Sequence, residues 1–163
     1  MKYFSQRALT NIMSCIVPVL LLEVSMSYFL VIDALAKQGA ISDALETEHE
    51  LILFLMTTLN QAIVLGAGRH VMVHLVDIID EECRSHFAHE EKYMSECGAA
   101  NLESHLTAHQ RLLERTLQVR SSIVNCDPLG IPDAMDLLYS LQNHINHFDQ
   151  SAYQCAQPLA KAS

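Results

Sequence analysis

The chain has no tryptophan and little glycine or proline, with five glycines and four prolines among 163 residues. Half of the residues are apolar, so a full core is available while few residues would end a helix. This composition predicts long helices joined by few turns. The length corresponds to one domain, with room for an appended segment.

Basic residues are also scarce. Ten lysines and arginines stand against 19 acidic residues, which gives a net charge of −9. Proteins that bind nucleic acid concentrate lysine and arginine on one surface, and this chain has no basic stripe. We therefore expect no nucleic-acid partner.

Closely spaced cysteine pairs are missing as well. The five cysteines are odd in number, widely separated and never arranged as C-x-x-C. This pattern predicts reduced thiols in a reducing compartment, and it argues against a disulfide framework or a zinc ribbon.

The N-terminal 40 residues form a hydrophobic segment distinct from the rest. Residues 12–32 are mostly apolar and long enough to span a bilayer, but Glu23 near their centre would cost about 2.5–3.5 kcal/mol on insertion. Three interpretations stay open: a membrane anchor, a hydrophobic helix docked on the remaining chain or on a partner, and a signal peptide ending at residues 34–36.

Residues 41–158 carry four amphipathic segments in which apolar side chains recur at helical spacing. The predicted helices cover about 42–65, 69–97, 102–124 and 133–156. Two glycine-containing turns, Gly66-Ala67-Gly68 and Gly98-Ala99-Ala100, and a proline-containing loop at 126–132 separate them. We expect an all-α fold, an up-down-up-down antiparallel four-helix bundle with the extra hydrophobic N-terminal segment, and a short tail at 159–163.

Metal-type ligands concentrate in the two central helices. His86 and Glu90 are four residues apart, and so are His105 and His109. Residues at this spacing share one helical face. His49, His144 and Asp149 add ligand-type side chains from the first and last helices.

In an antiparallel bundle these seven residues reach one level, which gives five imidazoles and two carboxylates. A lone histidine on an apolar face is more often an ordinary core or surface residue. Seven such groups in register would be costly to bury without a shared partner. Two metal ions bridged by two carboxylates can use all of them, and the donor types suit iron, and also manganese or zinc. His144 and Asp149 are five apart, so either Asp149 reaches back or the helix distorts.

Residues 42–155 resemble the hemerythrin-like family, specifically the bacterial hemerythrins. The matching motifs are E-T-E-H ending at His49, H-F-A-H-E-E-K-Y-M from His86, H-L-T-A-H from His105 and H-I-N-H-F-D from His144. The resemblance implies a non-haem di-iron centre that binds O2 reversibly. It assigns His105, His109 and His144 to one iron, His49 and His86 to a second iron with an open position for O2, and Glu90 and Asp149 as bridges. Phe87 and Leu53 are candidates, by position, for the apolar lining of the O2 pocket.

Two positions depart from the family pattern. Ser140 stands where the family usually has tryptophan, and Glu82 where it often has tyrosine; both changes would open the pocket wall. The leading hypothesis is O2 binding for sensing, storage or delivery, without turnover. The alternatives are a di-iron enzyme that reduces O2, peroxide or nitric oxide, and a helical module that holds zinc or no metal.

The expected location is the bacterial cytoplasm, or the cytoplasmic membrane if residues 12–32 anchor the chain there. Other histidines are expected outside the site. His89 and His147 should face outward or sideways, with a hydrogen-bonding role beside the ligands as the alternative. His70 and His74 lie near the start of their helix, away from the ligand level.

Overall fold

The computed structural model describes residues 41–126 and 130–149. Its elements are α2 (Ile41–Val64), α3 (Arg69–Cys97), α4 (Leu102–Val124), α5 (Gly130–His144) and the π-helical turn η1 (Ile145–Asp149). The described residues contain no strand, which confirms the prediction of an all-helical fold. The predicted ranges 69–97 and 102–124 coincide with α3 and α4.

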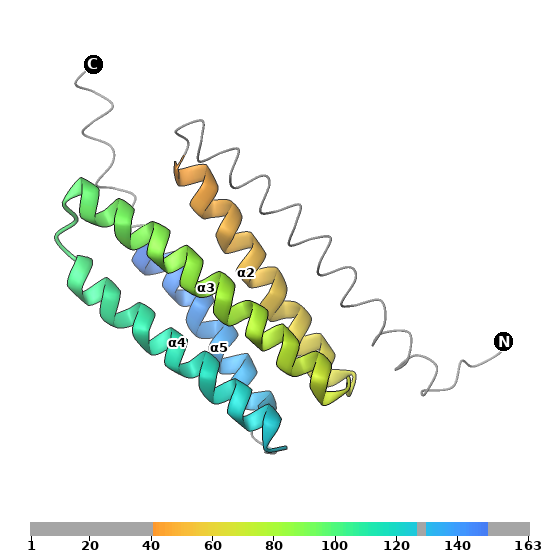
Figure 1. Ribbon diagram of the computed structural model, residues 1–163. Coiled ribbons are helices and arrows are strands. Elements are labelled where there is room, and N and C mark those ends of the chain that lie inside the picture. Colours follow the sequence, from red (N-terminus) through yellow and green to blue (C-terminus); the bar gives the residue numbers. More distant parts are fainter. Residues whose placement is uncertain (1–40, 127–129, 150–163) are drawn as a thin grey trace.

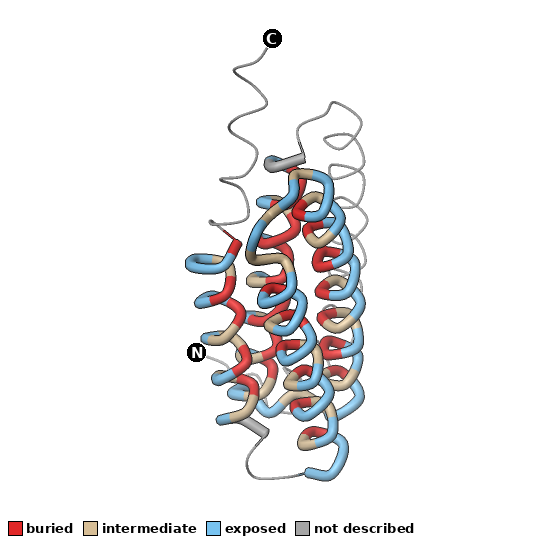
Figure 2. Tube along the Cα trace, turned by 90° about the vertical axis from the view of Figure 1, so that its left-hand side faces the viewer, coloured by how far each residue is buried: buried red, intermediate tan, exposed pale blue. Residues whose placement is uncertain are grey.

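Four helices lie side by side as a bundle (Figure 1). α2 packs against α3, α3 against α4, α4 against α5, and α5 against α2, so the contacts close a ring. Each helix therefore has two neighbours and one face toward a shared interior. Figure 2 shows buried positions along the inward faces of these helices and exposed positions outside.

Helices α2 and α3 end at glycines, as the sequence predicts. Gly66 and Gly98 have φ angles of 67° and 69°, a left-handed conformation that glycine adopts without a Cβ penalty. Behind them, the N–H of Ala67 donates to Ala62 O at 2.8 Å, and that of Ala99 donates to Met94 O at 2.9 Å. These bonds satisfy carbonyls that a helix end otherwise leaves unpaired.

The last helix begins earlier than expected. Residues 130–132, which the sequence assigns to a loop, form the first turn of α5. Proline is compatible with this position because the first turn of a helix does not need its N–H groups. The loop prediction is therefore wrong for these three residues.

Buried residues divide the bundle into an apolar part and a polar end. The core cluster includes Ile52, Met56, Leu59, Leu75, Ile79, Val119, Leu137 and Leu141. Burying each such side chain contributes roughly 1.5–3 kcal/mol. Next to this cluster the buried side chains become histidines and carboxylates. The apolar part stabilises the bundle, and the polar end is where a site forms.

Some predictions concern residues outside the described part. Residues 1–40 and the tail at 159–163 are among them, so the three interpretations of residues 12–32 stay open. Among the helices the structure describes, none has the length and hydropathy to cross a membrane.

The cysteines differ from expectation at one position. Cys97 is disulfide-bonded, whereas the sequence spacing predicted reduced thiols. Cys83 and Cys126 are free, as the spacing predicted. Burial raises the pKa of the Cys83 thiol to about 12, which suits a packing role.

Candidate metal centre

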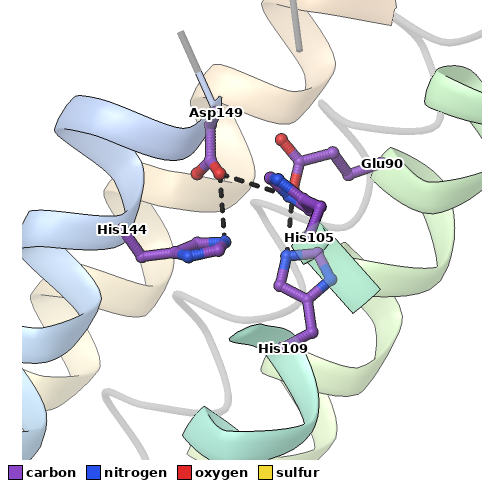
Figure 3. A group of neighbouring side chains, drawn as sticks. All are labelled: Glu90, His105, His109, His144 and Asp149. Atoms are coloured by element: carbon purple, nitrogen blue, oxygen red, sulfur yellow. Dashed lines mark hydrogen bonds and ion pairs between the residues drawn. The ribbon is translucent and has the colours of Figure 1, made fainter. Parts of the chain in front are cut away.

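All seven predicted ligand residues are buried at one end of the bundle, none more than 4% exposed. They form two groups whose ligand atoms lie within 4.8 Å of one another. The three-histidine subsite contains Glu90, His105, His109, His144 and Asp149 (Figure 3). The two-histidine subsite contains His49, His86, Glu90 and Asp149. Both carboxylates therefore belong to both subsites.

The helical elements explain why these side chains converge. The pairs four residues apart in α3 and α4 each present two groups on one face, as the sequence predicts. His144 and Asp149 are five apart, which in a regular α-helix would place them about 140° apart around the axis. The π-helical turn η1 follows His144 and ends at Asp149, and Asp149 Oδ1 lies 3.1 Å from His144 Nε2. Of the two alternatives that the sequence left open, the structure shows the distorted helix; such π turns often occur at functional sites.

In the three-histidine subsite, ring nitrogens surround one oxygen of each carboxylate. His105 Nε2 lies 3.0 Å and His109 Nε2 3.3 Å from Glu90 Oε2. His105 Nε2 is also 3.5 Å from Asp149 Oδ1, the same oxygen that faces His144. Figure 3 shows these side chains, from α3, α4, α5 and η1, pointing toward one another.

The other oxygen of Asp149 faces the two-histidine subsite. Its Oδ2 lies 3.0 Å from His49 Nε2. His86 Nε2 lies 3.8 Å from Glu90 Oε2. Asp149 thus directs one oxygen to each subsite, which is the arrangement that a carboxylate bridging two ions requires.

Several of these buried atoms lack a hydrogen-bond partner, which tests whether a metal fits. They are the Nε2 atoms of His86, His109 and His144, Glu90 Oε1 and both Asp149 oxygens. Ligand atoms of these residues lie within 4.8 Å of one another in each subsite, yet the atoms named here make no hydrogen bond. Buried polar groups without partners are costly. Cations at this centre would supply the missing partner for all of them, so the residues fit metal ions.

The protonation states also suit metal binding. Burial opposes ionisation of Glu90, but its close contacts with the rings of His105 and His109 outweigh burial and lower the pKa of Glu90 to about 2. The pKa of Asp149 is likewise lowered, because its contacts with His144 and His49 outweigh burial. Both carboxylates are therefore charged at neutral pH, as metal ligands must be.

The pKa values of the two histidines in the two-histidine subsite shift in opposite directions. Burial lowers the pKa of His86, so its ring is neutral and has a lone pair to offer. For His49, burial acts in the same direction, but the close contact with the negatively charged Asp149 carboxylate outweighs it and raises the pKa of His49. A metal cation would take the place of that proton between His49 and the carboxylates.

Two further glutamates hold the ligand rings from outside. His86 Nδ1 is 2.9 Å from Glu48 Oε2, and His109 Nδ1 is 2.8 Å from Glu91 Oε1. A carboxylate only accepts, so each Nδ1 carries the proton and each Nε2 is left as the ligand atom. Sequence reasoning missed both glutamates. The one available signal is that each adjoins a ligand in the chain, Glu48 before His49 and Glu91 after Glu90.

The two candidates for the O2-pocket lining lie in different surroundings. Phe87 is buried and its ring stacks on His109, with centroids 3.8 Å apart and planes 10° apart. Leu53 is half-buried and outside the core cluster, whereas Ile52 beside it is buried within that cluster. The structure thus places Phe87 against a ligand ring and gives no such contact for Leu53.

The remaining histidines lie outside both subsites. His70 and His74 are exposed on α3. His147 is exposed and its Nδ1 lies 3.1 Å from the carbonyl oxygen of Asn143. His89 is partly exposed, as predicted, yet its Nδ1 hydrogen-bonds to Glu48 at 2.8 Å.

Comparisons with protein-family models, with curated proteins and with solved structures found no match to this chain. The hemerythrin resemblance therefore rests on the four sequence motifs alone. A buried cluster of histidine, glutamate and aspartate that could hold metal ions is what the geometry itself establishes.

Proposed function

We propose that this chain is a hemerythrin-like protein that binds O2 reversibly at a non-haem di-iron centre, in an up-down-up-down antiparallel four-helix bundle. One observation carries the proposal. The seven ligand-type residues form two groups that share Glu90 and Asp149, so two ions would be joined by two carboxylates.

The unequal number of histidines supports a site for a small ligand. The three-histidine subsite offers three nitrogens and two carboxylates, whereas the two-histidine subsite offers two nitrogens and the same carboxylates. The two-histidine subsite thus offers one donor fewer, so an ion held there would have more room for a small ligand. Imidazole and carboxylate donors suit iron, and reversible O2 binding needs a metal that changes oxidation state, which zinc does not. A ferrous pair held here would supply the electrons and the open position for O2.

Residues around the centre would control the access of water to it and the orientation of the histidine ligands. Phe87 covers the ring of His109 and, with the apolar cluster behind it, keeps bulk water from that side of the centre. Glu48 and Glu91 hold His86 and His109 with their Nε2 atoms toward the metals. A dry, fixed surrounding slows the proton-dependent loss of reduced oxygen species, which is what a carrier, store or sensor of O2 requires.

A di-iron enzyme is the second candidate. Glu82 is half-buried, and burial together with Glu81 and Glu48 raises the pKa of its carboxyl. A titratable group of this kind, with Ser140 in place of a large aromatic residue, would favour proton delivery and turnover of O2, peroxide or nitric oxide. Such an enzyme would use the same seven ligands.

An optical spectrum of the iron-loaded protein separates these possibilities. The protein is reduced without oxygen, exposed to air and then deoxygenated. A charge-transfer band that appears in air and bleaches on deoxygenation would support reversible O2 binding. Rapid, irreversible oxidation would favour the enzyme, and a protein that takes up no iron would refute the di-iron proposal. His109→Ala should give no band, and His74→Ala, on an exposed residue outside both subsites, should leave it unchanged.

A further inference from the structure

Glu48 links a buried ligand to the protein surface. Its side chain, from α2, is 7% exposed and lies between two histidines of α3. Its Oε2 is 2.9 Å from His86 Nδ1, and its Oε1 is 2.8 Å from His89 Nδ1. His86 is 1% exposed, whereas His89 is 53% exposed. One carboxylate therefore joins a ring inside the metal centre to a ring in contact with solvent.

Both hydrogen bonds are needed to fix the Glu48 carboxylate. The terminal torsion of a glutamate is soft and has no sharp rotamer, so a carboxylate held at one oxygen can still turn. The bond from His89 holds the second oxygen and stops this rotation. The plane of the carboxylate then fixes the direction of the His86 Nδ1–H bond, and with it the direction in which His86 Nε2 points.

This support acts on one subsite only. His86 belongs to the two-histidine subsite and not to the three-histidine subsite. The latter has a separate support, the hydrogen bond between Glu91 and His109. A substitution at Glu48 or His89 should therefore change the affinity for the ion in the two-histidine subsite, and a substitution at Glu91 should change the affinity for the other ion.

We propose that Glu48 and His89 are positioning residues for the ion of the two-histidine subsite, so that a surface histidine sets how tightly that ion is held. This inference rests on the dinuclear centre proposed above. Loss of a hydrogen-bonding partner behind a ligating histidine typically weakens metal affinity about 10- to 100-fold.

The test is a titration of the full-length, metal-free protein with Co²⁺, followed by its visible absorption, which reports the coordination of each bound ion. The wild-type protein should bind two ions per chain in separable steps. His49→Ala removes a ligand found only in the two-histidine subsite and so identifies the step that belongs to it.

His89→Ala should weaken that step by about 10-fold or more and leave the other step within about twofold. His89→Gln keeps an N–H donor for Glu48 and should restore affinity to within about threefold of wild type. Glu91→Gln should weaken the other step instead. His74→Ala, an exposed histidine on the same helix, should change neither.

Three results would overturn the inference while the dinuclear centre stands. The first is that His89→Ala binds two ions with wild-type affinities, and the second is that His89→Ala and His89→Gln weaken binding equally. The third is equal weakening of both steps in His89→Ala, because the effect would then not be local. Fewer than two ions in the wild-type protein would refute the dinuclear centre itself. His89 is on the surface, so these variants do not depend on tolerance of a buried substitution at Glu48.

Discussion

Glu90 should matter for both metal ions, whereas His49 should matter for one. Glu90 is fully buried and belongs to both subsites, and His49 belongs only to the two-histidine subsite. Glu90→Gln keeps the size of the side chain but removes the negative charge shared by both subsites and replaces one of its two oxygens with an NH2 group that does not bind metal. We therefore expect Glu90→Gln to lose stabilisation by both ions and His49→Ala to lose that of one.

The magnitude follows from linkage. A ligand present at about 1,000 times its Kd stabilises the folded state by about 4 kcal/mol per site, hence about 8 kcal/mol for two ions. For a chain of this length each kcal/mol corresponds to roughly 2–4 °C in Tm. His49→Ala should therefore keep about half of the metal-dependent rise in Tm, a gain of roughly 8–16 °C, and Glu90→Gln should keep little of it.

Thermal unfolding followed by circular dichroism, with and without Fe²⁺ under nitrogen, measures this rise. Glu81→Gln is the matched control, because Glu81 is exposed on the same helix and outside both subsites; it should keep the full rise. If Glu90→Gln retained as much metal-dependent stabilisation as His49→Ala, the shared role of Glu90 would be wrong.

Three further predictions concern the metal-free protein, the pocket and a turn. The pKa of Glu90 is lowered to about 2, so its ionised carboxylate stabilises the fold above its usual pKa near 4.5, and this stabilisation is lost as pH falls from 4.5 toward 2. Urea unfolding of the metal-free protein should therefore show the free energy of unfolding falling by roughly 3 kcal/mol over this range. The fall should be absent in Glu90→Gln. Phe87→Ala should lower the free energy of unfolding by about 3–5 kcal/mol and speed oxidation of the ferrous protein in air, as followed by absorbance. Leu137→Ala in the core is the control: it should lower the free energy of unfolding by about 2–5 kcal/mol without faster oxidation. A Cβ at Gly98 would meet open space, but the backbone there is left-handed. Gly98→Ala should therefore lower the free energy of unfolding, measured with urea, by about 1–2 kcal/mol and leave the iron content unchanged.

Helical periodicity and glycine positions were sufficient to predict most of the described fold. The ranges of α3 and α4 follow from apolar spacing interrupted by glycine, because the bonds that end a helix are local. The start of α5 was missed for a local reason too, since a proline that ends one helix is equally compatible with the first turn of the next.

The seven ligand-type residues could be predicted because their spacing within each helix is a property of the chain alone. Glu48 could not, because it lies 38 positions from His86, and only the packing of α2 against α3 brings the two together. Burial also differs between sequence neighbours, since Ile52 is buried and Leu53 is half-buried. Neighbouring residues differ by about 100° around a helix axis, so an apolar stripe alone does not specify which of them is buried.

The most direct test of the central claim is the number and magnetic coupling of iron ions in the protein loaded anaerobically and then oxidised, measured by metal analysis and Mössbauer spectroscopy. Two irons per chain with coupled spins are expected, because Glu90 and Asp149 would join the two subsites. One iron per chain, or two irons that behave as isolated ions, would contradict a carboxylate-bridged pair at this site.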